Sequence, residues 1–318
     1  MTDRTTLLII LAILGGMAAV AWTMIAARSG PDPETIRRAY ATPAPPPGDG
    51  LRVFHLGHSL VGRDMPAMLQ QLAGTGHAYE SQLGWGTSLM QHWEPDEPIK
   101  GFDEENAHPR FRPAHEAVGS GDYDAVVLTE MVEIRDAIKY HDSGSYFPKW
   151  AASARAGNAE TRVYLYETWP RLDDPDGWLT RLDRDVERYW TEEILLRDLA
   201  VNAPERPAYL IPAGQVMAAF VRALESRGSI GAVQSRQDLF RRTEADELDP
   251  IHVNDLGAYL VALTHYAVLY QRSPVGLPHE LRRADGTPAA APSEEVARLM
   301  QRTVWEVVKE EEMTGVPQ

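Results

Sequence analysis

The sequence predicts an α/β domain with a central parallel sheet of about five strands and helices on both faces, preceded by a single N-terminal hydrophobic helix. Two observations predict the domain. Short apolar runs that stop at glycine or proline alternate with longer segments whose apolar residues recur at helical spacing. One run, residues 125–128, reads Ala-Val-Val-Leu, as expected of a strand buried on both faces. Strands separated by helices indicate parallel pairing.

The expected elements follow in chain order. Strands are predicted at residues 52–56, 79–83, 125–128, 163–166 and 208–211. Helices are predicted at residues 65–72, 178–199, 215–225, 255–270 and 294–312, the last of them capped by Ser293. Because ligands of such sheets bind at the carboxyl ends of the strands, we expect the chemistry in the loops that follow the five strands.

The hydrophobic helix is predicted from an uncharged stretch between Arg4 and Arg28. Its apolar core, residues 7–25, would span roughly 28 Å as a helix, close to the hydrocarbon thickness of a bilayer. We expect residues 1–28 to form an uncleaved membrane anchor. A cleaved signal peptide is the alternative, because Ala19-Val20-Ala21 resembles a small-residue cleavage site. The flanking arginines lean slightly toward a cytoplasmic domain, but we expect an exported one, because a single span before one soluble domain commonly serves export.

Domain boundaries follow from composition. Six prolines lie within residues 29–50, which predicts a semi-extended tether without a core of its own. The folded domain is expected over residues 51–275. Residues 276–318 are expected to form an extension whose helix packs on that domain.

Charge and cysteine content exclude several classes of function. The 318-residue chain has 31 Lys and Arg against 46 Asp and Glu, a formal charge of −15, which disfavours binding to nucleic acid. It has no cysteine, which excludes thiol nucleophiles, disulfides, iron–sulfur clusters and cysteine-bound zinc. His55 and His58 suggest a metal site, but no third ligand accompanies them. We therefore expect no metal or other cofactor.

Two distant motifs hold residues of the kinds used in nucleophilic catalysis. Gly57-His58-Ser59 follows the first predicted strand, and Asp249-Pro250-Ile251-His252 precedes the helix at 255–270. A serine needs a base to take its proton, and a histidine base needs a carboxylate to fix its tautomer. Each motif alone is also an ordinary turn sequence. Together they make Ser59, His252 and Asp249 the candidate catalytic residues.

With these motifs the sequence resembles the SGNH, or GDSL-like, hydrolase family over roughly residues 51–275. In that family the nucleophile follows the first strand in a Gly-Asp-Ser or Gly-Asn-Ser context, and Asp-x-x-His forms the last block. Here the middle residue is His58, and the last block continues as Asn254-Asp255-Leu256-Gly257. The resemblance implies a flavodoxin-like three-layer sandwich and ester hydrolysis through Ser59, His252 and Asp249.

The resemblance also implies an oxyanion hole. The N–H of Ser59 is one expected donor, and Gly86, which matches the glycine of the family's second block, is another. The third block usually contributes an asparagine side chain, whereas this chain has Thr129-Glu130 there. The Thr129 hydroxyl is expected to donate weakly, and an ionised Glu130 would oppose a nearby oxyanion. The departure predicts a slower enzyme or a differently built hole.

Other polar and aromatic residues are expected near the substrate. Glu130, His92 and Trp169 lie in or after strand-end loops and are predicted to shape the pocket. Residues 140–146 are predicted to lie in a long loop that could form a lid.

Three functions stay open. The leading prediction is a membrane-tethered serine esterase that hydrolyses a small-molecule or carbohydrate ester, such as O-acyl groups on cell-envelope material. A catalytically idle carbohydrate-binding module would fit the missing third-block donor. An O-acyltransferase would use the same Ser59, His252 and Asp249 and differ in the acceptor that attacks the acyl-enzyme.

Overall fold

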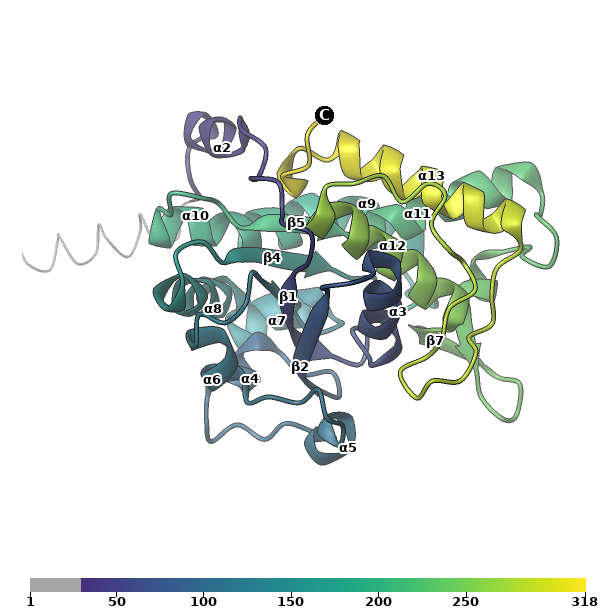
Figure 1. The fold of residues 1–318 in the computed structure, drawn as a ribbon, viewed down its shortest axis with the longest axis horizontal. Coiled ribbons are helices and arrows are strands. Elements are labelled where there is room, and N and C mark those ends of the chain that lie inside the picture. The colour runs from purple at the N-terminus through teal and green to yellow at the C-terminus, as the bar shows by residue number, and fades with distance from the viewer. Residues whose placement is uncertain (1–29) are drawn as a thin grey trace, which may run out of the picture.

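The computed structural model describes residues 30–318, and its centre is one sheet of five parallel strands (Figure 1). The strands are β1 (Arg52–His58), β2 (Ala78–Gly84), β3 (Ala125–Leu128), β4 (Arg162–Glu167) and β5 (Tyr209–Pro212). Their order, β2-β1-β3-β4-β5, is that of flavodoxin-like folds. The five predicted strands are thus confirmed, each with its ends within two residues of the observed ones.

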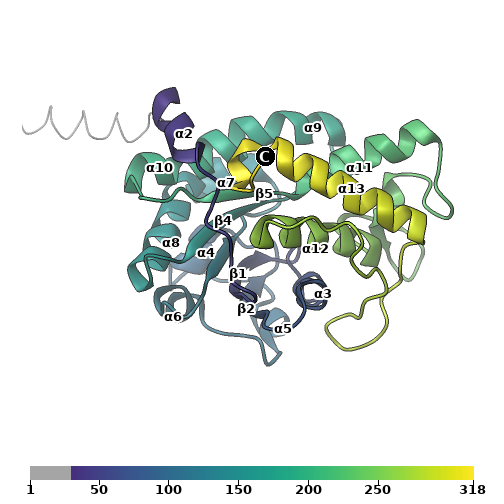
Figure 2. The ribbon, with the colours of Figure 1, turned by 45° about the horizontal axis from the view of Figure 1, so that its top comes forward.

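Successive side chains of the strands point to opposite faces of the sheet and fill two separate cores. Val53, Val127 and Ile211 pack in one core, whereas Phe54 and Val126 pack in the other. Helices of the first core are α3 (Asp64–Ala73), α9 (Trp178–Asp185), α11 (Ala213–Arg227), α12 (Asp255–Tyr270) and α13 (Glu294–Glu310). Helices of the second are α4 (Leu89–Trp93), α6 (Ala114–Gly119), α7 (Ile134–His141), α8 (Ser143–Gly157) and a π-helix at Val186–Leu195. Figures 1 and 2 show α3 and α12 on one side of the sheet and α6 and α8 on the other.

Helix α12 is enclosed by its neighbours. Every residue from Gly257 to Tyr270 is buried, and the helix packs against α3 and α13. Its sequence is apolar all round, which is the pattern of a helix without a solvent face. Since α12 begins three residues after His252, this burial anchors the segment that carries the predicted base.

One predicted helix is divided in the structure. Residues 178–199 form α9, then the π-helix, and the chain continues into α10 (Leu196–Asn202). Trp190, Ile194 and Leu195 of the π-helix are buried in the second core. A shift of the hydrogen-bond register by one residue changes the spacing of apolar side chains too little to be read from sequence.

The predicted lid over residues 140–146 is wrong. Those residues end α7 and begin α8, and α8 buries Phe147, Trp150, Ala151 and Ala154 at helical spacing. Gly144 and Pro148 lie near the start of α8. The sequence therefore does not predict this helix, because both residue types usually interrupt helices. Helix α5 (Phe102–Asn106) and the short 3-10 helices at Arg236–Leu239 and Glu312–Thr314 were not predicted either.

The proline-rich segment also differs from a simple tether. Helix α2 (Pro33–Tyr40) begins at Asp32, whose carboxylate accepts hydrogen bonds from the N–H groups of Glu34 and Thr35 (both 3.1 Å). The segment docks on the domain through the Tyr40 hydroxyl, which donates to the carbonyl of Ala208 (2.8 Å).

The predicted membrane anchor, residues 1–28, lies outside the described residues and stays a prediction, as does the exported location. Within residues 30–318, no helix combines the length and the apolarity that a bilayer crossing requires.

Candidate active site

The turn that carries Ser59 lies at the carboxyl end of β1. The N–H of Val61 donates to the carbonyl of His58 (2.9 Å) and closes the turn. Gly57 comes just before it, and a Cβ there would lie 2.3 Å from the methyl group of Thr129. Close packing between β1 and the end of β3 therefore requires the glycine of this motif.

The side chain of His58, the residue that departs from the family pattern, fixes this turn through hydrogen bonds to the backbone. Its Nε2 donates to the carbonyl oxygen of Glu130 (2.7 Å), and its Nδ1 accepts from the N–H of Leu60 (3.3 Å). One nitrogen donates and the other accepts, so the ring must be neutral. Burial, together with the nearby His252, lowers the pKa of His58 to about 4, which keeps it neutral.

His92 supports the same turn from α4. Its Nε2 donates to the carbonyl of Gly57 (2.8 Å), and its Nδ1 accepts from the side-chain amide of Gln82 (3.0 Å). Burial lowers the pKa of His92 to about 4 as well. Two neutral, buried imidazoles therefore fix the backbone on both sides of His58 and Ser59.

Asp249 and His252 both lie on β7 (Leu248–Val253), which pairs antiparallel with β6 (Phe240–Arg242) beside the main sheet. The Asp249 carboxylate folds back along the chain, and its Oδ1 accepts from the N–H groups of Ile251 (2.9 Å) and His252 (3.0 Å). Partial burial favours a higher pKa, but these hydrogen bonds and the imidazole outweigh it and hold the pKa of Asp249 below its usual value. Asp249 is therefore ionised at neutral pH.

The structure brings Ser59, His252 and Asp249 into one hydrogen-bonded chain. Ser59 Oγ lies 2.9 Å from His252 Nε2, and His252 Nδ1 lies 2.8 Å from Asp249 Oδ2. Because the ionised carboxylate can only accept, Nδ1 donates to it, and Nε2 is left to accept the serine proton. Ser59 and His252 are 193 positions apart in the chain, so only the tertiary structure creates this contact.

Strand β7 is tied to the loop that follows β4. The indole N–H of Trp169 donates to the carbonyl of Ile251 (2.9 Å), and the N–H of Leu172 donates to the carbonyl of Pro250 (2.7 Å). Both carbonyls belong to the segment between the acid and the base. The loop therefore helps to set the position of the imidazole.

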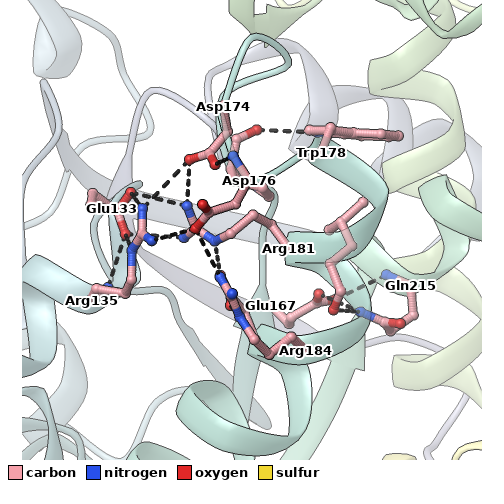
Figure 3. A network of polar contacts seen from close by, with 12 residues as sticks. Glu133, Arg135, Glu167, Asp174, Asp176, Trp178, Arg181, Arg184 and Gln215 are labelled. Atoms are coloured by element: carbon pink, nitrogen blue, oxygen red, sulfur yellow. Dashed lines mark hydrogen bonds and ion pairs between the residues drawn. The ribbon is translucent and has the colours of Figure 1, made fainter.

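An ionic network anchors the next part of that loop (Figure 3). Arg181 of α9 is fully buried and pairs with Asp174 (2.5 Å), Asp185 (2.6 Å) and Glu133 (3.0 Å). Figure 3 shows Arg135 beside Glu133 and Asp174, and it pairs with both (2.9 and 3.5 Å). The network thus joins the loops after β3 and β4 to α9.

Two of the three expected oxyanion donors face the candidate site. Ser59 and Gly86 line the same cavity, and within residues 30–318 neither backbone N–H has an acceptor. Gly86 has a φ of +57°, which favours glycine. The Thr129 hydroxyl instead donates to the carbonyl of Tyr166 (2.7 Å) and is fully buried, so its one proton is already used.

The three residues expected to shape the pocket do not line it. His92 and Trp169 are buried and act on the backbone, as described above. Glu130 is also buried, and its carboxylate accepts from the N–H groups of Met131 (2.8 Å) and Leu89 (3.3 Å) at the start of α4. Burial raises the pKa of Glu130 to about 7. Glu130 does not line the cavity, and its carboxylate is used by these backbone groups.

Ser59 and His252 open into a cavity of about 850 Å³, a size suited to a small organic ligand. Its walls were mostly missed from sequence. They include Arg63, Trp85, Val132, Arg241, Ile251 and Arg283. Trp85, 51% exposed, is held by a hydrogen bond from its indole to Glu105 (2.9 Å). The position of Trp85 next to Gly86 is the one feature of the sequence that indicates a place in the cavity wall.

Comparison with known proteins supports the fold. No family model matches the chain, and no curated protein matches it significantly. The chain is similar to a solved DUF4886 family protein from Bacteroides uniformis, at 14% identity and a TM-score of 0.52, over 81% of this chain and 95% of that one. It is also similar to the aryl esterase of M. smegmatis, at 12% identity and a TM-score of 0.36, over 69% and 97% of the two chains. The first likeness shows a shared fold, and the second is too distant to carry an argument.

Proposed function

We propose that this protein is a serine hydrolase that cleaves esters through Ser59, His252 and Asp249. The observation that carries the proposal is the continuous hydrogen-bonded chain from Ser59 Oγ to Asp249 Oδ2, with Ser59 at the wall of a ligand-sized cavity. Such a chain activates a serine without a cofactor.

In the first half of the reaction, Ser59 Oγ attacks the ester carbonyl carbon while His252 Nε2 takes its proton. Asp249 stabilises the imidazolium that forms. The N–H groups of Ser59 and Gly86 are the proposed donors to the oxyanion. When the tetrahedral intermediate collapses, the C–O bond to the alcohol breaks and the alcohol leaves with the proton from His252.

In the second half, water attacks the acyl-enzyme. His252 takes a proton from the water and returns it to Ser59 Oγ as the acyl group leaves as a carboxylic acid. The proposed oxyanion hole contains backbone donors alone, so each donor contributes much to the rate. Loss of one oxyanion donor typically lowers kcat by about 10²–10³-fold.

The test uses the purified full-length chain, 4-nitrophenyl acetate and a fluorophosphonate probe. We expect turnover and covalent labelling of Ser59, and Ser59→Ala should abolish both. Ser88→Ala is the matched control: Ser88 also contacts a histidine, with Oγ 3.0 Å from His141 Nδ1, but it is buried and does not line the cavity. The control should keep both activities. An unlabelled, inactive wild-type chain would reject the proposal and favour a binding module.

A further inference from the structure

The cavity at Ser59 differs in charge from the rest of the protein. Acidic residues outnumber basic ones by 46 to 31 in the chain, whereas the cavity wall holds four arginines and three acids. The arginines are Arg63, Arg171, Arg241 and Arg283, and the acids are Asp64, Glu105 and Asp285. The proportion of basic to acidic residues is therefore higher at the cavity wall than in the chain as a whole.

Two of the four arginines are already neutralised. Arg171 makes two hydrogen bonds to the carboxylate of Asp173 (3.0 and 2.9 Å). Arg283 makes two to the carboxylate of Asp255 (3.0 and 2.6 Å). The charge of a guanidinium paired in this way is already compensated by a carboxylate, so it attracts a further anion less strongly.

The other two arginines, Arg63 and Arg241, have no carboxylate partner within residues 30–318. Each is anchored by a backbone carbonyl instead. Arg63 donates to the carbonyl of Glu104, and Arg241 donates from Nε to the carbonyl of Val253 (2.9 Å), the residue after His252. The guanidinium has five N–H donors, so each anchored arginine keeps several of them for a ligand.

The three acids of the wall accept hydrogen bonds from the protein itself. Asp64 accepts from the N–H of Ala284 (3.0 Å), and Glu105 accepts from the indole of Trp85 (2.9 Å). Asp285 accepts from the N–H of Thr287 (2.8 Å). These donors are neutral, so the acids keep their charge; Asp64 and Asp285 lie near Arg283, which compensates them in part.

We propose that this site selects esters that carry a second, anionic group, and that Arg63 and Arg241 bind that group. The inference rests on the hydrolase proposed above and specifies its substrate. A guanidinium pairs with carboxylates and phosphates in the same forked geometry, so the shared chemistry is an oxyanion attached to the ester-bearing molecule.

The test compares two esters with the same leaving group. Mono-4-nitrophenyl glutarate carries a terminal carboxylate, and 4-nitrophenyl valerate is its neutral counterpart. We expect the wild-type chain at low salt to have the larger kcat/KM for the glutarate ester, and added salt to reduce the difference. Competitive inhibition of valerate hydrolysis by succinate and by inorganic phosphate separates carboxylate from phosphate as the favoured anion.

Variants assign the effect to the two arginines. Arg241→Gln and Arg63→Gln should each lower the glutarate-to-valerate ratio of kcat/KM by between about 10-fold and 100-fold, as expected for loss of a charged hydrogen bond. Arg242→Gln is the matched control, because the neighbouring Arg242 bonds Asp246 and does not line the cavity. Its ratio should equal that of the wild type.

The outcomes distinguish the two proposals. Turnover of both esters with an equal or inverted preference, or a ratio that the two variants leave unchanged, would overturn the anionic substrate and leave the hydrolase standing. Absence of turnover together with an unlabelled Ser59 would overturn the hydrolase, and this inference with it.

Discussion

Individual side chains around Ser59 act mainly on the backbone. His92 donates to the carbonyl of Gly57, and His58 donates to the carbonyl of Glu130. Trp169 donates to the carbonyl of Ile251, and the Thr129 hydroxyl donates to the carbonyl of Tyr166. Polar residues in strand-end loops thus position the backbone around the proposed active site and do not line the cavity. Such support is what keeps a nucleophile and its base at hydrogen-bond distance.

The substitution Trp169→Phe tests whether one such hydrogen bond to the backbone affects catalysis. The ring volume is nearly kept, but the hydrogen bond to Ile251 is lost, so we expect His252 to sit less well against Ser59. We predict a fall in kcat between about 10-fold and 100-fold with KM little changed, since a misplacement of about 1 Å can cost about 10²-fold. Steady-state kinetics on 4-nitrophenyl acetate measure both constants.

Trp178→Phe is the control for that prediction. Trp178 is also buried and donates from its indole to a carbonyl, that of Pro170 (3.1 Å), and its indole makes no hydrogen bond to β7. Both variants should lose similar stability, and only Trp169→Phe should lose most of its kcat. Equal losses of kcat would show that the effect is general destabilisation.

At the scale of elements, the buried arginine of α9 joins parts of the chain that the sheet does not connect. Arg181 pairs with carboxylates of the loop after β3, of the loop after β4 and of α9 itself. The loop after β4 also contacts β7, which carries Asp249 and His252. Packing of α9 and the position of the base are therefore linked through this network.

Arg181→Met removes the charge and keeps much of the side-chain volume. The three carboxylates around it would be left without their common partner, so we predict a decrease of about 3–5 kcal/mol in the free energy of unfolding. Arg222→Met is the control, because its ion pair with Asp183 is exposed and should contribute roughly 0–1 kcal/mol. Urea unfolding of the three chains measures the difference, and equal midpoints for the two variants would contradict the prediction.

The whole molecule contains two sets of buried ionisable groups with opposite effects on stability. Among residues 30–318, burial lowers the pKa of five buried histidines, four of them to about 4 and that of His55 well below 6.5, and it also lowers that of the half-buried His108. The five are His55, His58, His77, His92 and His265. Burial raises the pKa of two fully buried carboxyls, to about 7 for Glu130 and to about 8 for Glu167, and it also raises that of the half-buried Glu311. Both sets favour the neutral form of a buried group.

These shifts predict the dependence of stability on pH. Between about pH 4 and 6.5 the unfolded chain binds more protons at the histidines than the folded chain does, so stability increases with pH. Between about pH 4.5 and 8 the folded chain binds more protons at the two carboxyls, so their contribution decreases with pH. Five histidines outweigh the carboxyls until about pH 7, where the unfolded chain has lost most of its histidine protons; above that pH the carboxyls decide the slope.

We therefore expect the free energy of unfolding to reach its maximum near pH ~7 and to fall gradually toward pH ~8. Urea unfolding across this range measures it. Glu167→Gln should flatten the decline above the maximum, because one of the two groups that cause it is removed. Stability that keeps rising to pH 8 in the wild-type chain would be inconsistent with these shifts.

The sequence by itself determined where the five strands lie and which serine, histidine and aspartate are candidates, because apolar periodicity and short motifs are local properties of the chain. The tertiary structure alone decided how the surrounding side chains are used. Glu130, His92 and Trp169 resemble pocket residues in sequence, but their partners are backbone groups from distant segments, which no local pattern encodes. The same holds for Arg63 and Arg241, which become neighbours of one cavity only when β1 and the β6–β7 hairpin come together.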